Sequence, residues 1–389
     1  MKEQRFQTHA YGSSLLMAVT LACFVPVQGS AGEASPRPQE AAIAKASKPY
    51  PTEEVRFSNA AAGVTLAGSF SAPEGKGPFP TVILLAGSGP NDRDEVAQGP
   101  QERDTGHKKF LVLADAVNRC GIAVLRYDKR GVGRSTGDFA SASLSDLASD
   151  AQAAIRYLAT RKDVDQNRIG LIGDSEGGYI APMIVTREPS LSFMVLLSTA
   201  ALPFDQVNII QKAAISRAEG KGEADIASDE ALYRQIFSVV LAANSPEDAR
   251  ATLTAMSKPL IANGRFSQAE ADVGIAGLTS PLGFEMMRYD PQPYLSQINI
   301  PVLVLNGSLD TQAPPKENLP AMRSALRANQ DVTILELPGL NHQLQSARTG
   351  APSEYALIDQ TLAPSAIKAI GDWLIVHTQK NKTAAKPAP

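Results

Sequence analysis

A serine flanked by glycines stands between a predicted strand and a predicted helix. The segment Gly173–Gly177 (GDSEG) follows the short apolar run 168–172 and precedes the apolar segment 178–185. A G-x-S-x-G turn between a strand and a helix is typical of the nucleophile elbow, where the hydroxyl projects above the edge of the sheet. So sharp a turn requires flanking residues without bulk, which explains the glycines. The pattern predicts that Ser175 is a nucleophile.

A serine hydroxyl becomes a nucleophile only when a base takes its proton and a carboxylate orients that base. The sequence contains four histidines, and His342 lies in a glycine-containing loop after the last predicted strand. Catalytic groups gather at the carboxyl ends of strands in open α/β sheets, so we expect His342 to be the base and His107 its rival. Asp310 follows the predicted strand 301–305. It is either a turn-forming residue or, as the order serine, acid, histidine indicates, the acid.

The chemistry also requires two backbone N–H groups that stabilise the negative charge developing on an acyl oxygen. One predicted donor is Glu176, the residue after Ser175, at the positive end of its helix. The second is expected in the glycine-rich loop after the predicted strand 81–85. Ser88 is our choice there, Gly87 is the alternative, and an ordinary Gly/Pro turn is the competing interpretation.

Other polar side chains near these motifs are candidates for the rim of a pocket. Arg93 belongs to a charged loop over 91–95, in which we expect internal salt bridges. Asp174 precedes the nucleophile, and a carboxylate there repels an oxyanion unless it is turned away or paired. His107 and Tyr179 complete the candidates. The sequence shows no cluster of metal ligands, and the predicted chemistry requires no metal and no organic cofactor.

Strands and helices are predicted to alternate along most of the chain, which is typical of a doubly wound, mostly parallel sheet. An antiparallel hairpin over 55–70 opens the pattern. The clearest helix covers 144–158, with apolar residues at i, i+3 and i+4 spacing and a start at Ser143 and Asp146 that resembles a capping box.

The alternation stops at about Leu202 and resumes after Leu295, and the segment between them is predicted to be helical. Helix starts are expected at Ser245 and Ser267. We interpret this segment as a helical cap inserted into the sheet domain. We expect the sheet edge above the nucleophile to cover its apolar side chains, so that the cap roofs an acyl pocket. Those side chains are Leu232, Ile236, Phe237 and Val240.

The chain's beginning resembles an export signal. Lys2 and Arg5 are basic, and the apolar run 15–27 is too short for a comfortable membrane span. We expect a periplasmic or secreted protein. Lipid attachment at Cys23 is the alternative, although the usual leucine three residues earlier is lacking. The other cysteine, Cys120, is expected to be buried and inert, without an internal disulfide.

Size and charge restrict the class of protein further. With 389 residues, 43% of them hydrophobic, the chain can bury a large core, and its net charge of −3 gives no reason to expect nucleic acid. No later apolar run is long enough to cross a bilayer. The predicted parts are a signal peptide at 1–31, a flexible lead-in at 32–53, a sheet domain at 54–201 and 296–380, a helical cap at 202–295 and a disordered tail at 381–389.

The sequence resembles the α/β-hydrolase-fold serine hydrolases, close to bacterial carboxylesterases related to dienelactone hydrolases and prolyl-oligopeptidase-type enzymes. The resemblance covers nearly all of 54–377. It implies Ser175 as nucleophile, Asp310 as acid, His342 as base and the helical insertion as a lid. The residue before the serine is often histidine in such elbows, whereas here it is Asp174. The motifs that carry the resemblance are the elbow and residues 87–94 (GSGPNDRD), 126–131 (RYDKRG), 306–310 (NGSLD) and 338–342 (PGLNH).

The predicted function is therefore an exported serine esterase that acts on a small-molecule ester through an acyl-enzyme. A peptidase, amidase or thioesterase on the same triad is the alternative, because one constellation serves all of these reactions. A non-catalytic binding protein on the same scaffold is a rival of a different class. The ordered serine, acid and histidine argue against it, because binding needs no such order.

Overall fold

The computed structural model describes residues 37–45, 50–96 and 107–379. The predicted signal peptide and the predicted disordered tail lie outside these residues. No helix within the described ranges combines the length and apolar character needed to cross a membrane.

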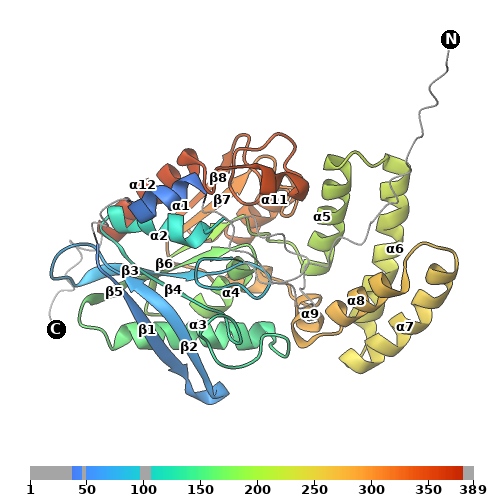
Figure 1. Ribbon diagram of the computed structural model, residues 1–389, viewed down its shortest axis with the longest axis horizontal. Coiled ribbons are helices and arrows are strands. Elements are labelled where there is room, and N and C mark those ends of the chain that lie inside the picture. Colours follow the sequence, from blue (N-terminus) through green and yellow to red (C-terminus); the bar gives the residue numbers. More distant parts are fainter. Residues whose placement is uncertain (1–36, 46–49, 97–106, 380–389) are drawn as a thin grey trace, which may run out of the picture.

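An eight-stranded sheet forms the centre of the larger domain, in the order β1-β2-β4-β3-β5-β6-β7-β8 (Figure 1). β1 (Thr52–Asn59) and β2 (Val64–Ser71) form the predicted antiparallel hairpin, and the later strands are parallel to one another. The predicted doubly wound, mostly parallel sheet is confirmed. The later strands are β3 (Phe79–Leu85), β4 (Ala123–Tyr127), β5 (Val164–Asp174), β6 (Leu191–Leu197), β7 (Val302–Gly307) and β8 (Val332–Leu337).

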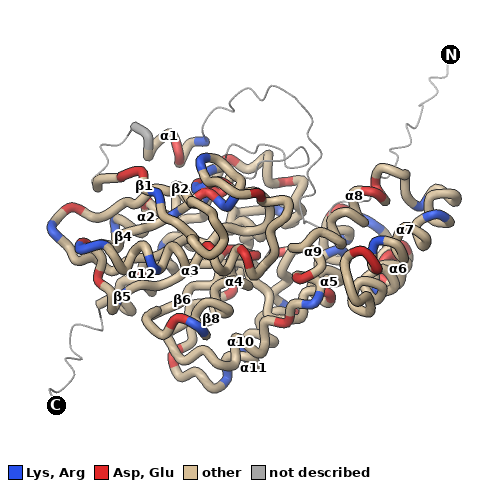
Figure 2. Tube along the Cα trace, turned by 90° about the horizontal axis from the view of Figure 1, so that it is seen from below, with Lys and Arg blue, Asp and Glu red and all other residues tan. Residues whose placement is uncertain are grey.

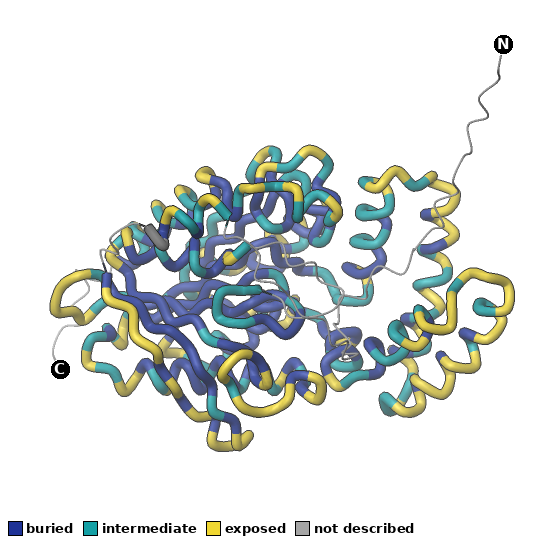
Figure 3. The backbone as a smooth tube through the Cα atoms, in the orientation of Figure 1, coloured by how far each residue is buried: buried dark blue, intermediate teal, exposed yellow. Residues whose placement is uncertain are grey.

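Helices cover both faces of the sheet, because successive side chains of a strand point to opposite sides. In β3, Ile83 and Leu85 pack into one apolar layer and Val82 and Leu84 into the other. Figure 3 shows these central strands as the most buried part of the molecule. The first layer contains α3 (Leu144–Ala159), α4 (Glu176–Val185) and α11 (Pro315–Ala325), and the second contains α1 (Pro38–Lys45), α2 (Lys109–Arg119) and α12 (Pro364–Gln379).

The strand order reverses at β3, because the chain passes from β3 to β4 on one side and continues to β5 on the other. Ligands bind at such a switch point, outside the carboxyl ends of the strands. The loop with Gly87 and Ser88 follows β3, and Ser175 follows β5. The topology alone therefore brings the predicted oxyanion loop beside the predicted nucleophile.

The predicted helix starts are confirmed. Ser143 caps α3 and exchanges hydrogen bonds with Asp146 in a capping box. In the insertion, Ser245 caps α7 (Pro246–Ala262), and Ser267 opens α8 (Gln268–Leu278) with a second capping box.

The inserted helical cap lies between β6 and β7 and stands beside the sheet domain in Figure 1. It contains α5 (Phe204–Ala218), α6 (Glu223–Ala242), α7, α8, α9 (Pro281–Met286) and α10 (Gln292–Leu295). Figure 2 shows acidic and basic positions scattered together over cap and core, without separation of the two signs.

The expectation about the apolar side chains of the cap is wrong. Phe237 and Val240 of α6 are buried in a cluster of the cap's own, with Ile209 of α5, Leu253 of α7 and Leu278 of α8. The neighbouring cap helices therefore cover these faces, and the sheet edge does not. Four helices that pack on one another bury an apolar stripe without help from the sheet.

The lead-in predicted to be flexible contains a docked helix, which corrects that expectation for 38–45. In α1, the amide oxygen of Gln39 accepts the N–H groups of Thr361 and Leu362, at 2.6 and 3.0 Å. The buried Glu40 accepts the N–H of Lys108 at 3.1 Å. These long-range contacts, which no local sequence pattern reports, hold the helix against the domain.

Candidate active site

The elbow after β5 holds Ser175 in a strained conformation, with φ +48° and ψ −110°. A positive φ is uncommon outside glycine and is found at functional sites. A Cβ atom on Gly177 would lie 2.0 Å from the Leu85 carbonyl oxygen, and one on Gly173 would lie 2.5 Å from the Gly177 carbonyl oxygen. Both glycines are therefore sterically required, as the sequence predicts.

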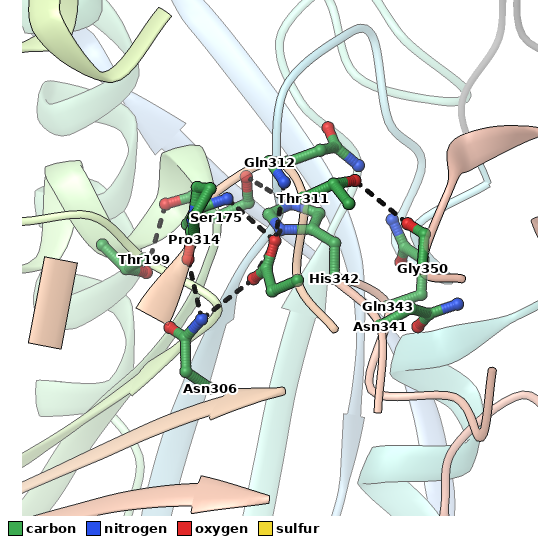
Figure 4. A network of polar contacts seen from close by, with 12 residues as sticks. Ser175, Thr199, Asn306, Thr311, Gln312, Pro314, Asn341, His342, Gln343 and Gly350 are labelled. Carbon is green, nitrogen blue, oxygen red and sulfur yellow. Dashed lines mark hydrogen bonds and ion pairs between the residues drawn. The ribbon is translucent and has the colours of Figure 1, made fainter. Parts of the chain in front are cut away.

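The structure brings Ser175, His342 and Asp310 together from three separate segments. Figure 4 shows Ser175 and His342 within this network. His342 Nε2 lies 3.1 Å from Ser175 Oγ, and its Nδ1 lies 2.9 and 3.0 Å from the carboxylate oxygens of Asp310. His342 and Asp310 are buried. A proton on Nδ1 facing the carboxylate leaves the lone pair of Nε2 toward the serine hydroxyl, the arrangement that a general base requires.

Backbone and side-chain donors fix the Asp310 carboxylate. One oxygen accepts the N–H groups of Gln312 and Ala313, both at 2.8 Å, and the other accepts the amide of Asn306 at 3.1 Å. These three hydrogen bonds fix the orientation of the carboxylate, so that it faces Nδ1 of His342. Asn306, the residue of β7 that precedes Gly307, has no predicted role in the sequence, because an Asn-Gly pair there also fits an ordinary turn.

The two predicted oxyanion donors belong to the start of α4 and to the loop after β3, which lies close to Ser175. Glu176 is the first residue of α4, so its N–H precedes the helical hydrogen-bond ladder. In the loop after β3, the N–H of Gly87 donates to Glu95 at 2.7 Å. This bond engages the alternative donor and favours Ser88. The loop is close to the nucleophile, because a Cβ atom on Gly87 would lie 3.4 Å from Cβ of Ser175.

Two buried ion pairs, neither of which the sequence predicts, flank the elbow. Lys109 Nζ lies 2.6 Å from the Asp174 carboxylate, and Lys129 Nζ lies 2.9 Å from that of Glu176. Buried charges require such partners. Because Lys109 neutralises the Asp174 carboxylate, this carboxylate is paired, as the sequence analysis requires if it is not to repel an oxyanion. A lysine near the start of an amphipathic helix otherwise suggests a solvated position, so no local pattern predicts this role for Lys109.

Glu95 lies beside the ion pair of Asp174 and Lys109. Burial, and then the charge of Asp174, raises the pKa of Glu95 well above its ordinary value. Burial by itself lowers the pKa of Lys109, but the Asp174 carboxylate, 2.6 Å away, raises it above the ordinary value. We therefore assign a protonated Glu95 beside a charged Lys109.

Arg93 lies in the charged loop but forms no salt bridge inside it, contrary to expectation. Its guanidinium binds the Asp128 carboxylate through Nε and Nη2, at 2.9 and 2.8 Å, and reaches Glu54 through Nη1 at 2.5 Å. Asp94 of the same loop pairs with Arg126. The partners stand on β1, on β4 and just after β4, because the loop folds across these strands.

The other rim candidates support the site from outside it. His107 bonds to Thr361 through Nδ1 at 2.7 Å and to Gln345 through Nε2 at 3.0 Å, so His342 and not His107 contacts the serine. Burial, and then Arg37, lowers the pKa of His107. Tyr179 is buried, with its ring 5.8 Å from that of Phe204 and 5.5 Å from that of Tyr289, at the base of the cap.

Within the described ranges, no group of three or more His, Cys, Asp or Glu side chains is arranged to hold a metal ion. The chemistry that the arrangement supports is nucleophilic attack by a serine, with proton transfer through a histidine.

Comparisons with known proteins agree with this fold. The family model described as serine aminopeptidase, S33, matches residues 107–223. Esterase EstD of Thermotoga maritima is 28% identical over 291 residues, 75% of this chain and 61% of EstD. The chain thus spans about three fifths of the length of this relative. The α/β hydrolase domain-containing protein WAV2 of Arabidopsis thaliana is 31% identical over 93 residues, 24% of this chain and 29% of WAV2.

Among solved structures, the Pyrococcus furiosus esterase Pf2001 superposes with a TM-score of 0.51 at 15% identity, over 85% of this chain and 92% of that one. The strand order, the elbow and these matches define an α/β-hydrolase fold with an inserted helical cap. The resemblance to bacterial esterases of this fold is confirmed.

Replacing Glu95 with Gln is expected to weaken the pH dependence of stability. Because folding raises the pKa of Glu95, its stabilising effect is full below the ordinary Glu value of about 4.3 and is lost as the pH rises toward the folded-state value. Gln keeps an oxygen acceptor for Gly87 and carries no charge. Urea unfolding between about pH 5 and about pH 8 should therefore show a smaller decline for E95Q than for the wild type.

The exposed Glu247 of α7 provides the matched control, because E247Q removes a carboxylate that stands in solvent. Its stability profile should run parallel to that of the wild type. An E95Q profile that also runs parallel would contradict the protonated state assigned to Glu95.

Proposed function

We propose that this protein is a serine hydrolase that cleaves carboxylic esters through an acyl-enzyme intermediate. The observation that carries the proposal is the hydrogen-bonded series from Asp310 through His342 to Ser175. The strained elbow and the name of the relative EstD support it.

In the proposed reaction, Ser175 Oγ attacks the acyl carbonyl carbon while His342 Nε2 takes the hydroxyl proton. Asp310 holds the imidazole and stabilises the imidazolium. The N–H groups of Ser88 and Glu176 stabilise the tetrahedral oxyanion. His342 then returns the proton to the departing alkoxide, which leaves as the alcohol. Water deprotonated by the same histidine then attacks the acyl carbonyl carbon. The bond to Ser175 Oγ breaks, His342 returns the proton to that oxygen, and the carboxylic acid leaves.

The Ser175→Ala variant tests the nucleophile. We expect it to fold and to lose at least about a thousandfold in kcat toward a small ester, as other triads do without their serine. A fluorophosphonate probe should label the wild type and fail to label S175A. The buried, strained Ser198 provides the control, and S198A should still be labelled. Labelling of S175A would mean that another serine is the nucleophile.

Peptide hydrolysis is the second candidate, because the matching family model is described as a serine aminopeptidase. Thioester hydrolysis uses the same triad. The test is a panel of p-nitrophenyl esters of increasing chain length, a thioester, and aminoacyl and peptidyl anilides. We expect kcat/KM to be highest for an ester. A higher value for an anilide would replace the esterase assignment by a peptidase, and a wild type that turns over none would favour a binding protein.

We also propose that the protein is exported to the periplasm or beyond, which the basic start at Lys2 and Arg5 and the apolar run 15–27 support. Lipid attachment at Cys23 is the alternative. When the whole chain is expressed in a bacterial host, mass spectrometry should find a mature N-terminus near Gly32. A diacylglyceryl cysteine at position 23 would select the lipoprotein, and a retained Met1 would contradict export.

A further inference from the structure

A buried lysine connects the two segments that supply the proposed oxyanion donors. Lys129 lies two residues past β4. Its Nζ donates to the carbonyl oxygens of Gly87 and Gly89, at 2.5 and 3.0 Å, and to the Glu176 carboxylate at 2.9 Å. Only 6% of its side chain is exposed. These three bonds use all three donors of the ammonium group.

We propose that Lys129 is a positioning residue for the oxyanion hole, which orients and polarises the Gly87–Ser88 peptide group so that the Ser88 N–H receives the oxyanion. This inference rests on the proposed serine hydrolase function.

The orientation follows from the planarity of the peptide bond. The carbonyl of Gly87 and the N–H of Ser88 belong to one trans peptide unit, so they point in opposite directions. Lys129 and the side-chain amide of Asn91, at 2.8 Å, both hold the Gly87 carbonyl oxygen. The Ser88 N–H is thereby directed away from them. Because Glu95 holds the N–H of Gly87 as well, this residue is fixed through both its polar backbone groups.

The charge of Lys129 acts on the same peptide unit. A cation bonded to a carbonyl oxygen withdraws electron density from the amide, and hydrogen bonds in series strengthen one another. The bond is charge-assisted and lies in a site shielded from water. The Ser88 N–H is therefore expected to be a stronger donor than that of a peptide whose carbonyl faces solvent.

The partner of Lys129 belongs to the other donor residue. The Glu176 side chain accepts from Lys129, while its backbone N–H begins α4 beside Ser175. A buried ion pair is a poor means of stabilising a fold, because apolar residues of similar size often serve equally well. We infer instead that the ion pair holds the Gly87–Ser88 peptide group at a set distance from the start of α4.

The test uses the variants K129M and K129M/E176Q in the full chain. The double variant keeps the Glu176 backbone N–H and leaves no unpaired buried carboxylate. For each we would measure kcat and KM with a p-nitrophenyl ester, and the affinity for a trifluoromethyl ketone, which forms a tetrahedral oxyanion on the serine. Circular dichroism and fluorophosphonate labelling would verify the fold and the reactive serine. K129Q, which keeps a neutral donor, should lose less.

We expect kcat to fall by roughly 10²- to 10³-fold, the loss seen when one oxyanion donor is removed, with little change in KM. Affinity for the ketone should fall by a comparable factor. The matched control is R130M/D150N, which removes the neighbouring buried pair of Arg130 and Asp150, 2.7 Å apart and without contact to the oxyanion loop. It should lower thermal stability and leave the affinity for the ketone unchanged.

A folded, labelled K129M/E176Q with the wild-type affinity for the ketone would overturn the role of Lys129 and leave the proposed hydrolase intact. Equal losses of affinity in R130M/D150N would likewise overturn it, because a general loosening of the domain would then account for both. A wild type that neither hydrolyses esters nor reacts with the probe would overturn the proposed function, and the oxyanion hole with it.

Discussion

The close approach of α4 to β3 is the constraint on which the site depends. Gly177 lies so near the Leu85 carbonyl that no side chain fits between them. This contact brings the start of α4 against the loop that follows β3, and it forces Ser175 into a positive φ. This backbone contact therefore brings the segments of the nucleophile and of the two proposed oxyanion donors together. The apolar packing of the surrounding sheet offsets the backbone strain at Ser175.

Around this contact the protein buries an unusual amount of charge. Lys109 with Asp174 and Lys129 with Glu176 are pairs whose side chains are at most 6% exposed. In a site of low polarity each lysine fixes the position of its carboxylate, and each pair contributes almost no net charge. An elbow with two acidic residues next to its serine is thus compatible with an oxyanion, because a buried lysine neutralises each carboxylate.

The cap forms a largely separate unit that is attached through its base. Its apolar cluster lies among α5, α6, α7 and α8, while Tyr179 of α4 packs against Phe204 and Tyr289 where the insertion leaves and re-enters the sheet domain. The hydroxyl of Tyr289 also donates to the Tyr179 carbonyl at 2.8 Å. Tyr179 stands four residues after the nucleophile on the same helix, so the base of the cap is coupled to α4 directly.

The sequence by itself determined the features that depend on local spacing. The period of the apolar residues, the capping serines and the two glycines of the elbow predict the sheet, the helices and Ser175, and the chain order of Asp310 and His342 completes the proposed triad. Tertiary structure decided which charges meet. Lys129 and Glu176 are 47 residues apart and Lys109 and Asp174 are 65 apart, and only the reversal of strand order at β3 makes them neighbours. The tertiary structure also decided that α1 docks on the domain and that the cap helices cover their own apolar faces. A local pattern shows only that a face is apolar, whereas its burial depends on which elements pack together.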